Sequence, residues 1–220
     1  LNVGEGDYSG CAALHAGTGA DGQPWLVMDG WASTARNSLA SSIITYDSET
    51  GFLGTYYPEG TGPSTLRKQT LRYDTALVST DIDGNGTIDI PMELTDGGTL
   101  MEPMDSRLKF LLWQDYSDAD GGNTCFGIYD SEYRFFLPLP QSMRGTVTVR
   151  ANTSGTGWLI RSTLGGTTYC EIRVVDPAED TDGEYLRIAT IGSQQLQYRE
   201  YTHYSGLNAI DLQNGVALFE

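Results

Sequence analysis

The sequence predicts an all-β protein built mainly of antiparallel strands, and three observations favour this class. Apolar residues recur with a period of two, or form short continuous runs, along most of the chain. Glycine is abundant, at 27 of 220 residues, and often stands in turn-forming pairs. Aromatic residues make up 10% and charged residues only 19%, which suits strands joined by tight turns better than helices or disorder.

The expected strands are short runs of β-branched, aromatic and other apolar residues bounded by turn signals. In the run 146–150, for example, Val147 and Val149 share one face while Arg150 lies on the other with the threonines. Helices are expected to be few, with 35–42 as a turn or two and 205–212 as one short helix that begins at Ser205 or Asn208. In chain order, the expected strands cover residues 25–29, 42–46, 75–79, 109–113, 125–129, 133–137, 146–150, 158–161, 169–175, 185–191 and 196–202.

Charge is distributed unevenly along the chain. Residues 1–106 hold 15 acids and 4 bases, a net charge of −11, whereas residues 107–220 hold 14 acids and 9 bases, a net charge of −5. The change coincides with a polar, glycine-containing segment at 96–105 that includes Pro103. A domain boundary is therefore expected near residue 106, with one continuous unit as the alternative.

The overall charge excludes two classes of partner. Asp and Glu number 29 against 13 Lys and Arg, which gives a net charge of −16. Such a chain repels nucleic-acid phosphates and anionic lipid.

The sequence contains no run of about 18 apolar residues, so no membrane span is predicted. Because the chain starts at Leu1 rather than Met, we expect a processed or truncated protein from which an export signal was removed. The predicted location is extracellular or anchored at the cell surface.

The three cysteines, Cys11, Cys125 and Cys170, lack the spacing of a metal finger or a redox pair. Two interpretations remain for them. Cys125 and Cys170 could form a disulfide, or all three could be small buried residues.

One segment carries a chemical pattern. Residues 81–91 read Asp-Ile-Asp-Gly-Asn-Gly-Thr-Ile-Asp-Ile-Pro, with oxygen-bearing side chains at relative positions 1, 3, 5 and 9 and glycines at 4 and 6. Ca²⁺ prefers six to eight oxygen ligands, and a tightly coiled loop presents alternate side chains to it. The alternative is an acidic turn without a metal. The predicted ligands are the side chains of Asp81, Asp83, Asn85 and Asp89 and the backbone carbonyl of Thr87.

The residues after this segment differ from an EF-hand. Position 12 of an EF-hand loop is a bidentate Glu, but here it is Met92, and Glu93 comes one place late. Pro91 disfavours a helix at this point because it lacks a backbone N–H. Since residues 75–80 and 88–93 are strand-like, the sequence predicts a calcium loop between strands.

The segment 81–91 resembles the calcium loop of FG-GAP/VCBS repeats, the units of integrin-α-type β-propellers. The resemblance implies a structural Ca²⁺ held by the ligands named above, in a loop that joins neighbouring strands of a blade. It implies partial propeller-like blades in residues 1–106, followed by a β-rich C-terminal module in 107–220. A propeller needs four to eight four-stranded blades, and 1–106 can hold about two. The chain is therefore either a piece of a propeller or another β fold with the same loop.

A second resemblance concerns the residues from Tyr133 onward, which read Tyr-Arg-Phe-Phe-Leu-Pro-Leu-Pro-Gln-Ser-Met-Arg-Gly-Thr-Val. This run is similar to C-terminal modules of uncharacterised exported proteins of Gram-positive bacteria. It implies an exported, bacterial protein and no particular activity.

No catalytic residue is predicted. The only histidines are His15 and His203, and neither lies in a recognisable catalytic motif. We therefore expect an exported calcium-binding β-rich module with a binding or structural role at the cell surface, whose partner is an unknown protein or polysaccharide. The alternative is a carbohydrate-active or other hydrolytic enzyme with a carboxylate site. A third interpretation is an accessory fragment that needs missing blades.

Overall fold

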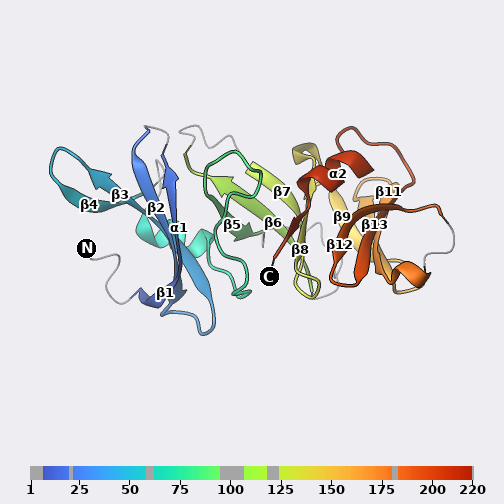
Figure 1. The fold of residues 1–220 in the computed structure, drawn as a ribbon, viewed down its shortest axis with the longest axis horizontal. Helices are drawn as coiled ribbons and strands as arrows, with labels where there is room; N and C mark the ends of the chain where they lie inside the picture. Colours follow the sequence, from blue (N-terminus) through green and yellow to red (C-terminus); the bar gives the residue numbers. More distant parts are fainter. Residues whose placement is uncertain are drawn as a thin grey trace. The chain divides into compact units, whose positions relative to one another are not determined.

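The fold is that of a computed structural model, which describes residues 7–19, 22–57, 62–94, 107–117, 124–179 and 183–219 (Figure 1). It consists of antiparallel sheets with short helices, so the predicted all-β class is confirmed. None of the described helices has the length and apolar character needed to cross a membrane.

The first sheet is a four-stranded meander in the order β1-β2-β3-β4. Its strands pair antiparallel throughout. Helix α1 (Pro63–Gln69) has Pro at its first position, where no backbone N–H is needed, and packs against β3. The strands are β1 (Tyr8–Thr18), β2 (Pro24–Ala32), β3 (Leu39–Asp47) and β4 (Phe52–Tyr56).

A hydrophobic cluster joins this sheet to α1 and to β5 (Asp89–Glu93). Two alternate residues of β2, Trp25 and Val27, belong to it, as the period of two predicts, together with Ile43 of β3. Ile90 of β5 is fully buried in the same cluster, so the strand at the end of the acidic loop is anchored in this core. The cluster contains Trp25, Val27, Ile43, Leu66 and Ile90, with Tyr56, Ile88 and Tyr116 packed against it.

Two further five-stranded sheets complete the fold. One has the order β14-β8-β7-β6-β5 and the other the order β12-β13-β11-β10-β9. Helix α2 (Ala209–Gly215) begins after Asn208, whose side chain accepts hydrogen bonds from two backbone N–H groups. The strands are β6 (Leu108–Asp115), β7 (Thr124–Asp130), β8 (Phe135–Leu139), β9 (Val147–Ala151), β10 (Gly157–Ser162), β11 (Thr168–Val175), β12 (Leu186–Ile191), β13 (Gln194–Glu200) and β14 (Ala217–Leu218).

The chain forms two compact units, each made of two segments. Unit 1 comprises Leu1–Glu93 and Leu111–Cys125, and unit 2 comprises Leu94–Phe110 and Phe126–Glu220. Residues 111–125 follow the boundary expected near 106 and yet belong to unit 1. The polar segment 96–105, on which that boundary was based, lies outside the described residues.

The prediction of a strand at 75–79 is wrong. This segment is a turn followed by irregular backbone, and only Thr80 forms an isolated bridge. Its backbone groups bond within the turn and to side chains instead of to a neighbouring strand. The backbone N–H of Ser79 donates to Asp29 at 2.6 Å, and Arg72 donates to the carbonyl of Leu77. A run of apolar and β-branched residues is thus held by a buried polar network rather than by a sheet.

Other differences have local causes. No helix forms over 35–42, because Asn37 has a left-handed φ of 55° and β3 begins at Leu39. The short helix expected over 205–212 forms as α2, which begins after Asn208, one of its two predicted starts, and runs on to Gly215. Strands β1 and β4 were not predicted, since β1 is rich in Gly and Ala.

All three cysteines are free, so the disulfide interpretation is wrong, and of the three thiols only Cys170 is fully buried.

Candidate metal site

The acidic motif forms a closed loop at the start of β5. Thr80 and Asp89 form an isolated antiparallel bridge in which each backbone N–H donates to the other residue's carbonyl, at 3.1 and 2.8 Å. The loop 81–88 lies between these two residues. No helix follows it, in agreement with the rejection of an EF-hand, although the chain before it is irregular rather than a strand.

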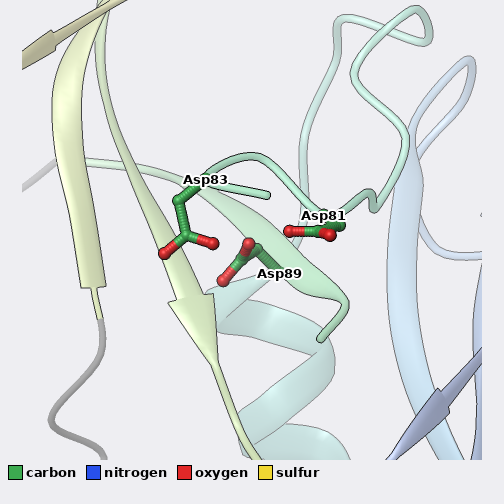
Figure 2. A group of neighbouring side chains, drawn as sticks. All are labelled: Asp81, Asp83 and Asp89. Atoms are coloured by element: carbon green, nitrogen blue, oxygen red, sulfur yellow. The ribbon is translucent and has the colours of Figure 1, made fainter. Parts of the chain in front are cut away.

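Three of the predicted side-chain ligands come together. One carboxylate oxygen from each of Asp81, Asp83 and Asp89 lies within 4.8 Å of the others. Figure 2 shows the three carboxylates directed toward one another, two from the loop and one from the first residue of β5. They differ in exposure, since Asp83 is exposed, Asp81 is half-buried and Asp89 is buried.

Backbone hydrogen bonds hold the loop in this shape. The N–H of Asn85 donates to Asp81 and to Asp83 at 3.0 and 3.1 Å, and the N–H of Gly86 donates to Asp81 at 2.9 Å. Gly84 and Gly86 have φ values of 74° and 89°, which side chains with a Cβ rarely adopt. The glycines at positions 4 and 6 thus allow the turn that brings the carboxylates together.

The other two predicted ligands, Asn85 and Thr87, form hydrogen bonds within the loop and to Asp115. The Oδ1 atom of Asn85 accepts from the backbone N–H of Thr87 at 2.8 Å, and its amide nitrogen donates to Asp83 at 3.1 Å. The hydroxyl of Thr87 donates to Asp115 at 3.0 Å. Asn85 and Thr87 therefore brace the loop through hydrogen bonds.

Asp115 is a site residue that sequence reasoning missed. It is the last residue of β6 and lies directly opposite Asp89 in the β5–β6 ladder. Both residues are buried, with 2% of each exposed. Besides Thr87, the N–H of Ser117 donates to Asp115, at 2.7 Å. The available signal was an acid at the end of an apolar strand, but its partner depends on a strand register that the sequence does not reveal.

The local electrostatics follow from this burial. The pKa of Asp89 is raised to about 7, first by burial and then by the charges of Asp83, Asp115 and Asp81, while one hydrogen bond from the N–H of Ile82 acts in the opposite direction. The pKa of the Cys125 thiol is raised to about 12, first by burial and then by Asp83 and Asp89. The site is therefore a region of concentrated negative charge.

The donor set indicates the kind of cation that fits. Among the described residues, the group of potential ligands consists of carboxylates alone. Hard oxygen donors suit Ca²⁺, Mg²⁺ or Mn²⁺, whereas Zn²⁺ sites usually include imidazole or thiolate. A divalent cation here would offset the repulsion between the acids and keep Asp89 ionised.

No protein-family model, curated protein or solved structure matches this chain. The likeness to FG-GAP/VCBS repeats therefore rests on the loop residues themselves.

Proposed function

We propose that this protein is an exported calcium-binding β-rich module, in which Ca²⁺ held by the loop 81–89 is structural. The observation that supports this most is the buried Asp89 facing the buried Asp115, with the carboxylates of Asp81 and Asp83 beside it. Buried carboxylates without a cation are costly, and a bound divalent ion offsets that cost.

The position of the loop favours a structural role. Asp89 is both a predicted ligand and the first residue of β5, whose next residue, Ile90, lies fully buried in the hydrophobic core of unit 1. A cation that binds the folded loop but not the unfolded chain stabilises the fold by about 2.7 kcal/mol when its concentration is 100 times the Kd. Calcium would thus fix the connection between the irregular segment 70–80 and the core.

An extracellular setting agrees with this chemistry. Calcium-binding modules outside cells function with dissociation constants of about 0.1 to 1 mM. The resemblance of the loop to repeats of secreted proteins and the strongly acidic composition, with a net charge of −16, support the same location. In this proposal the module binds a protein or polysaccharide at the cell surface, or supports a neighbouring domain that does.

Isothermal titration calorimetry of the metal-stripped chain with CaCl₂ tests the proposal. One calcium ion should bind per chain, and Asp81→Ala should abolish the heat of binding. Asp47→Ala is a matched control, because Asp47 also accepts hydrogen bonds from a turn but is the last residue of β3, at the β3–β4 turn. No saturable heat, or equal loss in both variants, would contradict the proposal.

A further inference from the structure

An open pocket lies in unit 1 where β2 ends. Its volume is about 420 Å³, within the range of small-molecule sites. It shares no residue with the acidic loop. The residues that line it are Ser9, Trp31, Ala32, Ser33, Arg36, Asn37 and Ser38.

Hydrogen bonds within the β2–β3 connection fix the wall of this pocket. The N–H of Ala32 donates to the carbonyl of Ser38 at 3.0 Å, and the Ser38 hydroxyl donates to the carbonyl of Ala35 at 2.6 Å. The N–H of Ser33 donates to the carbonyl of Asp7 at 2.9 Å, which attaches the connection to the start of β1. The wall therefore has its shape before a ligand arrives, which lowers the entropic cost of binding.

Three side chains of the pocket, those of Arg36, Asn37 and Trp31, are available to a ligand. Over the described residues, no hydrogen bond or ion pair engages the side chains of Arg36, Asn37 or Trp31. Trp31 is 37% exposed. Residues 1–106 contain only 4 bases against 15 acids, so an arginine without an acidic partner is unusual here. The pocket thus offers one uncompensated positive charge beside an aromatic ring.

These groups match one class of ligand. A guanidinium binds a carboxylate with two parallel hydrogen bonds. An indole offers a flat apolar face of the size of a sugar ring together with an N–H donor. An amide and hydroxyls donate to and accept from sugar hydroxyls. A pyranose ring bearing a carboxylate combines all three requirements.

We propose that this pocket binds a hexuronate unit, with its carboxylate on Arg36, its ring against Trp31 and its hydroxyls on Asn37. The inference specifies a ligand for the binding role proposed above, but it uses none of the calcium ligands. Either proposal can therefore fail without the other. Because the pocket is open and holds a single sugar, the expected affinity is weak, with a Kd of about 1 mM.

The test is an NMR titration of the full chain, kept in calcium, with glucuronate as the probe. Glucuronate should shift the Trp31 indole and Asn37 amide signals to saturation. Arg36→Gln should raise the Kd about tenfold, the loss of one charge-assisted contact. Arg187→Gln is the matched control, because Arg187 is an exposed arginine of β12 in unit 2, and it should leave the Kd unchanged.

Glucose and acetate separate the two parts of the ligand. Each should bind more weakly than glucuronate, because each lacks one of the matching groups. An affinity for acetate equal to that for glucuronate would show a simple anion site. An affinity for glucose equal to that for glucuronate would show that Arg36 does not bind the carboxylate. Either result would overturn the proposal, as would the absence of saturable shifts up to about 10 mM glucuronate, tenfold above the expected Kd. Trp31→Ala should abolish binding, with an unchanged unfolding temperature showing that the variant is folded.

Discussion

Asp89 and Asp115 face each other across the β5–β6 ladder, and both carboxylates are buried. Like charges in directly opposite positions destabilise an antiparallel pair. Here the arrangement is retained beside two further acids of the loop, Asp81 and Asp83. A divalent cation bound at this point would convert a destabilising arrangement into a stabilising one.

Replacing Asp115 should have opposite effects with and without calcium. In metal-free buffer near pH 7, Asp115→Asn should leave the unfolding temperature unchanged or raise it, because the charge that faces Asp89 is gone. In calcium the same variant should unfold several degrees below the wild type, because the site has lost negative charge. Thermal unfolding in both buffers measures the two effects. A decrease of equal size in both would show that Asp115 acts only through its hydrogen bonds to Thr87 and Ser117.

The stability of the metal-free protein should fall as the pH rises from about 4 to about 7. The pKa of Asp89 is about 7 in the folded chain, above its ordinary 3.8, so the folded state holds a proton that the unfolded state has released over this range. The loss is at most about 1.4 kcal/mol per pH unit for one proton. The calcium-induced rise in unfolding temperature should grow over the same range, because the metal displaces that proton. Asp89→Asn should remove this slope, and a slope that persists in the variant would assign it to another group.

Asp83→Ala should lower stability in calcium but hardly change it in metal-free buffer. Asp83 is exposed, and among the described residues Asn85 alone donates hydrogen bonds to it. In calcium, the unfolding temperature should fall by roughly 5 °C. The reason is that calcium binding contributes a few kcal/mol, and each kcal/mol corresponds to about 2–4 °C in a chain of this size. Asp47→Ala, in the β3–β4 turn, should lower stability equally in both buffers. Asp83→Ala behaving like Asp47→Ala would mean that Asp83 serves the turn alone.

A second buried group supports the segment that leads to the loop. Arg72 and Asp29 form a fully buried ion pair at 2.7 Å, and Ser41 and Ser79 donate to the same carboxylate. Burial alone would raise the pKa of Asp29, but the charge of Arg72 and these hydrogen bonds outweigh it and lower the pKa. The stability that the pair contributes should therefore be present at neutral pH and be lost on acidification.

Arg72→Met should destabilise unit 1 strongly, because it leaves Asp29 buried without a cation. Breaking a buried pair in this way costs about 3–5 kcal/mol. Arg67→Met removes an arginine from a partly exposed pair with Asp7 and should cost about 1 kcal/mol or less. Denaturant unfolding of both variants compares the two costs. Similar small losses would show that the buried pair is not what holds the segment 70–80.

The sequence predicted the fold class and the acidic loop for the same reason, which is that both depend on local patterns. Alternating apolar residues identified most strands, and the spacing of Asp81, Asp83 and Asp89 identified carboxylates that do converge. Asp115 could not be found in this way, because its place opposite Asp89 depends on the register of two strands separated by residues 94–107. The segment 75–79 was wrongly predicted as a strand, because it is held by a polar network that involves Asp29, 50 positions earlier than Ser79.

The most direct test of the calcium site is thermal unfolding of the metal-stripped chain at increasing CaCl₂, with MgCl₂ as the control and a metal analysis of the protein as purified. We predict a rise of several degrees that saturates with Ca²⁺ and is much smaller with Mg²⁺, which holds its water ligands more tightly. We also predict about one bound calcium per chain. An unfolding temperature that does not respond to Ca²⁺, together with a metal-free purified protein, would contradict the account and leave residues 81–89 as an acidic turn.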